Sequence, residues 1–287
     1  MQSNILLPIG DIQDIQRLLA ENPSWHRTQI SRELCKLWNW RTANGQLKDM
    51  ACRTLLLKLE RTGHIVLPAR RREAANHSRG NVPAFAEHST ETISCDFKSL
   101  AEVIIIPVQP KSKHHSLFNC LLAQYHYLGH RTTVGENMRY LITDCSDRPV
   151  SCMLFGSAAW KTTSRDAFIG WDHRIREKNV NRITNNTRFL ILPWVKVPHL
   201  ASHILGKISR RINSDWINKY GHPVYLLETF VDRSRFKGTC YKAANWIYTG
   251  QTKGRTRNDQ YRSIETTIKD VYVYPLSKNF REKLTDD

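Results

Sequence analysis

The first 72 residues place apolar side chains at the three- and four-residue spacing of amphipathic helices. Three segments have this pattern: 11–21, 28–38 and 46–61. A short apolar run at 65–67 follows, ends at Pro68 and leads into three arginines at 70–72. Three helices followed by a strand with a basic tip are typical of a winged helix, in which the third helix enters the major groove of DNA. The alternative for the same pattern is a small helical bundle with a solvated, charged face.

Residues 73–100 are small, polar and without periodicity, which is typical of an exposed, mobile linker, although 93–100 can pack on the part that follows. From residue 101 the pattern predicts a mixed sheet with helices on both faces. Strands are expected at 103–108, 138–144, 150–160, 187–192, 224–231 and 271–274, and helices at 116–128, 200–220 and 239–246. The turn at 146–149 predicts a hairpin. The chain is therefore expected to be of the α+β class, with a winged-helix domain at 1–72, a linker at 73–100 and a mixed α/β domain at 101–287.

The charge balance indicates which kind of partner this chain binds. There are 43 Lys and Arg residues against 26 Asp and Glu residues, a formal net charge of +17. A protein this basic attracts polyanions, and nucleic acid is the usual one because each phosphate contact releases counterions. An anionic membrane surface is the competing partner, but the sequence contains no long basic amphipathic helix. DNA is the expected partner.

Three further features indicate a cytosolic protein that does not enter a membrane. The longest apolar runs are strand-sized, far below the ~20 residues that a bilayer requires. The N-terminal segment has no basic region before its first acid, Asp11, so we expect no signal peptide. The seven cysteines include no CxxC pair, which favours reduced thiols over a disulfide framework or a zinc site.

Four longer phrases of the main domain resemble a known family when they are taken together and in order. They are YHYLGHRTTVGENMRYLI at 125–142, LFGSAAWKTTSRDAFIGWD at 154–172, NNTRFLILPW at 185–194 and ETFVDRSRFKGTCYKAANWIYTGQTKGR at 228–255. The family is that of the Druantia anti-phage system protein DruA, whose domain is also found in transposase-like proteins of insertion elements. The resemblance covers most of residues 30–275. It implies a role in defence or transposition and does not supply a catalytic set.

A weaker resemblance is to the fold of the Gcn-related N-acetyltransferases. The order of elements from 116 to 274 is similar, and the segment 240–246 looks like a characteristic helix of that fold. That family binds the coenzyme pyrophosphate at a glycine-rich turn whose N–H groups point at phosphate. The matching stretch here, 196–201, has no glycine, and Pro198 removes a donor. An acyltransferase is therefore the least favoured of the functions considered.

The densest basic stretch, 233–257, contains no acidic residue and interleaves cations with aromatic rings such as Phe236 and Tyr248. Basic side chains can hold phosphates while aromatic rings stack on unpaired bases. The alternative is a solvated face with aromatic residues in the core. Three further cations share one face of the predicted helix 200–220. The candidate nucleic-acid contacts are Lys48, Arg53, Arg70, Arg71, Arg72, Lys161, Lys207, Arg210, Arg211, Arg233, Arg235, Lys237, Lys253, Arg255 and Arg257.

Three carboxylates, Asp172, Glu228 and Asp232, are expected at or near strand ends and form the candidate catalytic set. Carboxylates gathered there could hold Mg²⁺ against a phosphodiester, as in a metal-dependent nuclease or transposase. Glu228 and Asp232 would lie ~13 Å apart along one strand, so sharing an ion requires the strand to end between them. The alternative is that they balance neighbouring arginines. The chain would then be a recognition module that passes DNA to a helicase or transposase partner.

Two histidine pairs, His126 with His130 and His199 with His203, have the i,i+4 spacing that can place two imidazoles on one metal ion. No HExxH pattern accompanies His126, and Gly129 is expected to end the helix before His130. Phosphate or solvent contacts are therefore favoured over zinc. The sequence has no nucleotide-binding glycine loop, so any use of ATP would belong to a partner.

Overall fold

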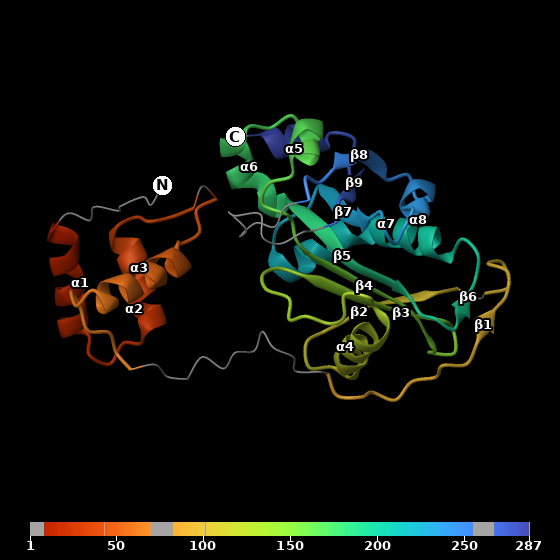
Figure 1. Cartoon of the computed structure of the whole chain (residues 1–287), viewed down its shortest axis with the longest axis horizontal. Coiled ribbons are helices and arrows are strands. Elements are labelled where there is room, and N and C mark those ends of the chain that lie inside the picture. Colours follow the sequence, from red (N-terminus) through yellow and green to blue (C-terminus); the bar gives the residue numbers. More distant parts are fainter. Residues whose placement is uncertain (1–8, 43, 70–82, 101, 255–266, 287) are drawn as a thin grey trace. The chain divides into compact units, whose positions relative to one another are not determined.

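The computed structural model describes residues 9–42, 44–69, 83–100, 102–254 and 267–286 (Figure 1). The chain divides into two compact units, Met1–His77 and Ser78–Asp287. Each unit has its own apolar core. Within the described ranges, no helix combines the length and the apolar character that crossing a membrane requires.

The first unit contains three helices: α1 (Ile9–Glu21), α2 (Arg27–Leu37) and α3 (Asp49–Arg61). These are the three helices that the apolar periodicity predicts. They bury a common core that includes Ile15, Ile30, Leu34, Cys35, Cys52, Leu55, Leu56 and Leu59. A β-bridge between Arg41 and Leu47 closes the connection between α2 and α3.

The predicted strand at 65–67 is wrong, because residues 64–69 form no strand. Ile65 and Leu67 instead bury their side chains in the helical core, and Arg27 Nε donates a hydrogen bond to the main-chain oxygen of Pro68 at 2.7 Å. The apolar run is therefore explained by packing on the helices and not by sheet pairing. A winged helix is not confirmed, and the arginines 70–72 expected at its tip lie outside the described residues.

The second unit is built on a seven-stranded mixed sheet, in the order β2-β3-β4-β5-β7-β9-β8. The strands are β2 (Ile104–Pro107), β3 (Met138–Thr143), β4 (Pro149–Ser157), β5 (Ile183–Ile191), β7 (Leu226–Asp232), β8 (Ile247–Gln251) and β9 (Lys269–Pro275). Neighbouring strands are antiparallel except β5 and β7, which are parallel. A second, two-stranded parallel sheet pairs β1 (Ile93–Ser94) with β6 (Val195–Lys196). The mixed sheet expected from the sequence is confirmed.

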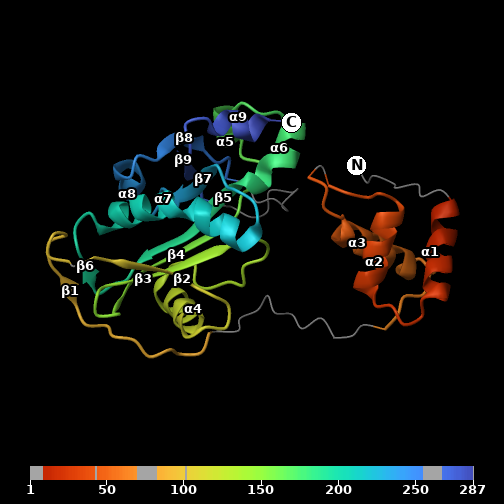
Figure 2. The same ribbon diagram turned by 180° about the vertical axis from the view of Figure 1, so that it is seen from behind.

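Helices cover both faces of this sheet. The helix α4 (Lys113–Tyr125) lies on one face, and α7 (Leu200–Tyr220) lies on the other (Figures 1 and 2). Every third or fourth residue of α7 from Leu200 to Trp216 is buried, which is why this sequence packs as a long helix on the sheet. The short helix α8 is Thr239–Ala243, and the remaining helices are α5 (Thr163–Ile169), α6 (His173–Asn179), the 3-10 turn Val180–Arg182 and α9 (Phe280–Thr285).

The hairpin between β3 and β4 forms where the sequence predicts it. The Asp144 carboxylate accepts hydrogen bonds from the main-chain N–H groups of Ser146 and Arg148, both at 2.9 Å. Asp147 takes a left-handed conformation with φ of 59°, which aspartate tolerates better than most residues. The turn chemistry therefore defines the register of the two strands.

Other expectations need correction. Asp172 does not close a strand, because it caps α6, where its Oδ1 accepts from Arg174 N (2.8 Å) and Ile175 N (2.9 Å). The helix expected at 239–246 ends at Ala243, and a strand that was not expected, β8, begins at Ile247. The described end of the expected linker is part of the second unit, where the His88 ring stacks on Trp194 with centroids 5.6 Å apart.

The feature that positions the site is the short pairing of β5 with β7. The parallel register covers only Ile183–Asn185 and Leu226–Glu228. Beyond these residues both strands continue, β5 to Ile191 and β7 to Asp232, without pairing to each other. The two strands therefore separate toward their carboxyl ends, which leaves a gap in the middle of the sheet for side chains to line.

Candidate functional site

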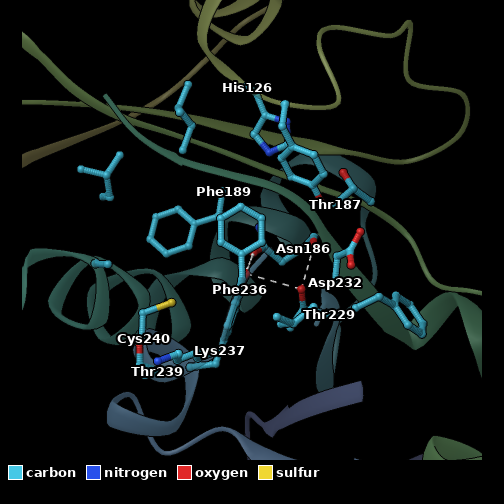
Figure 3. A pocket seen from close by; sticks show the side chains of 18 of the residues that line it. His126, Asn186, Thr187, Phe189, Thr229, Asp232, Phe236, Lys237, Thr239 and Cys240 are labelled. Carbon is cyan, nitrogen blue, oxygen red and sulfur yellow. Dashed lines mark hydrogen bonds between the residues drawn. The ribbon is translucent and has the colours of Figure 1, made fainter. Parts of the chain in front are cut away.

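A cavity of about 460 Å³ lies between the separated ends of β5 and β7 (Figure 3). One wall comes from β5, through Asn186, Thr187 and Phe189, and the opposite wall comes from Thr229–Asp232 of β7. The turn after β7, residues 236–241, and the residues at the end of α4, Tyr125–Tyr127, complete the lining. Four separate segments of the chain thus converge on one space.

The floor of the cavity is a closed hydrogen-bond network. The Tyr241 hydroxyl donates to Asn186 Oδ1 at 2.7 Å, and Thr229 Oγ1 donates to the main-chain oxygen of Asn186 at 3.1 Å. The Asn186 amide Nδ2 donates to the main-chain oxygens of Leu154 (3.2 Å) and Arg188 (3.0 Å). Since Asn186, Thr229 and Tyr241 are all buried, these bonds satisfy polar groups where the ladder between the strands ends. They connect β5, β7 and α8 at the point where the strands separate.

His126 presents one hydrogen-bond donor at the cavity wall (Figure 3). Burial, and then the nearby Arg188, lower the pKa of His126 to about 4, so the imidazole is neutral at physiological pH. Its Nδ1 accepts a hydrogen bond from the main-chain N–H of Leu128 at 3.1 Å. The proton of the neutral ring is therefore on Nε2. Among the described residues, none accepts a hydrogen bond from Nε2.

Two partly exposed aromatic rings border the cavity. Tyr127 is 41% exposed and Phe236 is 49% exposed, and their ring centroids are 5.4 Å apart at a tilt of 58°. The Arg235 guanidinium lies 5.1 Å from the Tyr127 ring centroid. Large apolar rings at a surface, with a cation against one of them, are suited to binding another planar group.

Two arginines lie in register on one face of the sheet, with one strand between them. Arg139 of β3 pairs with Leu154 of β4, and Leu154 pairs with Arg188 of β5. Residues in register across adjacent strands share a face, so the two arginine Cα atoms are two strand spacings, or about 10 Å, apart. Arg188 donates from Nε to the Gly129 oxygen (3.2 Å) and from Nη1 to the Thr187 oxygen (2.8 Å).

These arginines belong to a group of basic residues that we name the cation cluster: the arginines Arg131, Arg139 and Arg188, with the histidines His115 and His130 beside them. Burial lowers the pKa of Arg139 and of Arg188, and Arg131 lowers that of Arg188 further. Burial and the positive charge of Arg139 lower the pKa of both His115 and His130. Within the described ranges, no carboxylate forms an ion pair with Arg139 or Arg188. Partly buried positive charge without a counter-charge favours binding of an anion.

The candidate carboxylates are not brought together. Glu228 is fully buried, where Oε2 pairs with Arg165 Nη1 at 2.8 Å and Oε1 accepts from Ala159 N at 2.7 Å. Asp232 accepts from the Ser234 hydroxyl at 2.7 Å and from Thr267 at 3.0 Å, while Asp172 caps α6. In the described part of the chain, no group of three His, Cys, Asp or Glu side chains is arranged to hold a metal ion.

The buried residues Arg165 and Glu228 affect each other's pKa: burial raises the pKa of Glu228, and the charge of Arg165 and the hydrogen bond from Ala159 N oppose that rise. Burial lowers the pKa of Arg165, but Glu228 and Asp166 more than offset that effect, and the net direction is upward. Arg165 also donates from Nε and Nη2 to Asp166 Oδ1, at 2.9 and 2.7 Å. The pair is therefore a hydrogen-bonded unit of the fold, and Glu228 has no free oxygen directed at the cavity.

The predicted nucleic-acid contacts fall into four groups. Four are in ion pairs: Arg53 with Asp49, Lys207 with Glu102 (2.9 Å), Arg211 with Asp215 (2.7 Å) and Arg233 with Asp270 (3.6 Å). Arg235 and Lys237 are at the cavity, whereas Lys48, Lys161, Arg210 and Lys253 are exposed elsewhere. Arg70, Arg71, Arg72, Arg255 and Arg257 lie outside the described residues.

Arg139, Arg188 and Tyr127 are site residues that the sequence patterns do not predict. One signal was present: Arg188 is a lone charge in the otherwise apolar end of a strand, in the phrase NNTRFLILPW. A second was that Tyr127 and Arg139 both lie in the phrase 125–142 that carries the family resemblance. Neither signal shows that the two arginines share a sheet face, because that depends on the register through β4.

Comparisons with known proteins bear on this site. The sequence model described as Druantia protein DruA matches residues 58–269, from within α3 to the start of β9. Two solved structures with similar folds are spermidine N-acetyltransferases of Vibrio cholerae. One, the spermidine/spermine N-acetyltransferase SpeG with manganese ions, is 7% identical over 63% of this chain and 96% of that chain, with a TM-score of 0.39. The other, in complex with CoA and spermine, is 8% identical over 61% of this chain and 96% of that chain, also with a TM-score of 0.39.

No curated protein sequence matched the chain. The match to the family model covers most of the chain and includes both walls of the cavity and the cation cluster. It confirms the resemblance seen in the four phrases. The chain belongs to the Druantia protein DruA family.

Proposed function

We propose that this chain is a DNA-binding protein of an anti-phage defence system and that its second unit holds the DNA backbone at the cation cluster. The family name supports the defence role. The observation that carries the binding proposal is the pair Arg139 and Arg188, two partly buried guanidinium groups on one sheet face that form no ion pair within the described ranges.

The physical argument rests on the cost of leaving these charges unpaired. A cation that has lost part of its hydration and has gained no counter-charge destabilises the fold, and a bound anion offsets that cost. Phosphate suits guanidinium because it accepts two parallel hydrogen bonds. A polymer of phosphates suits a chain whose net charge is +17.

Exposed cations extend the cluster along the surface. Arg235 and Lys237, which are both exposed, lie at the cavity. Contacts of this kind position a nucleic acid without reading its sequence. Lys48, at the start of α3 in the first unit, is a further candidate contact. Any unwinding or cleavage would then be performed by a partner such as a helicase or transposase.

Direct metal-dependent cleavage is less well supported. The candidate carboxylates Glu228 and Asp172 already accept hydrogen bonds from protein groups. Acyl transfer is also less well supported, because α7 begins after Pro198 and its cap residue His199, with φ of 63°, provides no side-chain cap. That geometry lacks the glycine-rich turn expected of a pyrophosphate site.

Substitution of the two arginines tests the proposal. We expect Arg139→Gln to weaken binding of labelled DNA by about tenfold and to reduce the slope of log affinity against log salt by about one. Arg139 makes no side-chain hydrogen bond among the described residues, so the substitution leaves the fold intact. Arg188→Lys keeps the positive charge but cannot form the bidentate hydrogen bonds of a guanidinium with a phosphate. We expect it to weaken DNA binding less than Arg139→Gln does.

The matched control is Arg174→Gln, an exposed arginine of α6. Fluorescence anisotropy at several salt concentrations measures each affinity, and thermal unfolding checks each fold. If Arg139→Gln and Arg174→Gln change the affinity and the salt slope equally, the cation cluster is not the phosphate site.

A further inference from the structure

We infer that the cavity between β5 and β7 receives one unpaired nucleobase of DNA while the cation cluster holds the adjoining phosphates. This inference rests on the proposed function, since it names the form of DNA that the same site binds. It is carried by three observations: the shape of the cavity, the polar groups in its wall, and the division of charge between the cavity and the cluster.

The cavity has the size and the walls that a base requires. Its volume of about 460 Å³ lies within the range of small-ligand pockets. The rings of Phe189, Tyr127 and Phe236 line it, and the last two are partly exposed at its border. Stacking on aromatic rings is the usual means of binding a base that has left its own stack.

The polar groups of the wall match the edge of a base. His126 Nε2 is a donor without a partner among the described residues. The Asp232 carboxylate is an acceptor, and hydrogen bonds from Ser234 and then Thr267 lower its pKa, so it is charged. Nucleobase edges carry acceptors beside donors, and enzymes that read an extruded base use hydrogen bonds of this kind together with stacking.

The division of charge explains why the cavity takes the base and not the phosphate. The negative Asp232 lines the cavity together with Lys237, so the cavity wall carries both signs of charge and attracts a phosphate less than the cluster does, where Arg139 and Arg188 form no ion pair with a carboxylate within the described ranges. The two places are close to each other. Arg188 of the cluster lies close enough to His126 and Tyr127, which both line the cavity, for its charge to affect the pKa of each.

The test measures how much of the affinity comes from the base. The probes are a short labelled oligo(dT), the same oligomer with abasic residues, a fully paired duplex and a duplex with one mismatched pair. We expect the intact chain to bind oligo(dT) about tenfold more tightly than the abasic oligomer, the contribution of one stacked base. Tighter binding of the mismatched than of the paired duplex shows that an extruded base is also accepted.

Two variants locate the effect. The double variant Tyr127→Leu/Phe236→Leu changes exposed rings and keeps the fold, and His126→Asn keeps an acceptor near the Nδ1 position for the Leu128 N–H while removing the Nε2 donor. Each is expected to bring the affinity for oligo(dT) down toward that for the abasic oligomer and to leave the affinity for paired duplex unchanged. The control is Tyr248→Leu, a half-exposed ring on β8 that does not line the cavity.

The outcomes separate the two proposals. Equal affinity for oligo(dT) and the abasic oligomer, with both weakened by Arg139→Gln, overturns the base pocket and leaves the phosphate site standing. A base preference that survives both cavity variants also overturns the pocket. Failure of the intact chain to bind any of the four probes overturns the proposed function itself.

Discussion

Glu228→Gln separates a structural carboxylate from a catalytic one. In the native chain the two oxygens of Glu228 accept from Arg165 Nη1 at 2.8 Å and from Ala159 N at 2.7 Å, and neither Glu228 nor Arg165 is exposed to solvent. Glutamine has nearly the same shape but only one oxygen. One of these two buried donors must therefore lose its acceptor and face an NH₂ group.

The expected loss of stability depends on the partners that Arg165 keeps after Glu228→Gln. Removing one partner of a buried ion pair costs about 3–5 kcal/mol, because the other charge stays buried. Asp166 still accepts two hydrogen bonds from Arg165, which places the expected loss at the lower end, about 3 kcal/mol. Since domains are stable by only about 5–15 kcal/mol, this loss is large.

Urea unfolding of the full chain measures the loss of stability caused by Glu228→Gln. Trp171 reports on this region, because the Arg165 guanidinium lies 5.7 Å from its ring centroid. We expect a lower midpoint with an unchanged slope. The control Glu102→Gln changes an exposed acid that pairs with Lys207 and should leave the midpoint where it is. An unchanged midpoint for Glu228→Gln, together with loss of a metal-dependent DNA cleavage, would refute the structural explanation.

Three further predictions follow from the charges described above. First, the pKa of His126 is about 4 in the folded chain and 6.5 in the unfolded chain, so the unfolded chain takes up a proton first as the pH falls. The free energy of unfolding should therefore drop by up to about 3 kcal/mol between about pH 6.5 and pH 4. Denaturation at these two pH values should show that His126→Asn lacks this contribution to the drop. Second, replacing Arg70, Arg71 and Arg72 with Ala should flatten the salt dependence of DNA binding by up to about three phosphate contacts; an unchanged slope removes them from the interface. Third, isothermal titration should detect no acetyl-coenzyme A binding that survives high salt, because no glycine-rich turn precedes α7; salt-resistant binding would favour the acyltransferase instead.

The parts of the fold that the sequence predicts well are those with local causes. The helix α7 was expected at 200–220 and has those bounds, because Pro198 precedes it and Gly221, with φ of 76°, ends it. The strand β8, in contrast, was not expected because its cause is not local. Whether residues 247–251 form a strand depends on pairing with β9, which lies some twenty residues later in the chain, and no local pattern shows that.

The site was harder to predict because its chemistry depends on distant partners. Glu228 is unavailable because of Arg165, which is 63 residues away in the sequence. His126 and His130 were considered as a pair on one helix, but α4 ends at Tyr125. His126 instead lies after the helix, where burial and Arg188 lower its pKa and keep its imidazole neutral.

The short parallel pairing of β5 with β7 also has a consequence for folding. It joins two antiparallel halves that are each local in sequence, β2 to β5 at 104–191 and β7 to β9 at 226–275. Each half can form early from near neighbours, whereas the junction must wait until the crossover through α7 is in place. Amides along this junction should therefore exchange their hydrogens at a lower opening free energy than those inside either half. A molecule bound in the cavity would touch both halves and slow exchange in both at once.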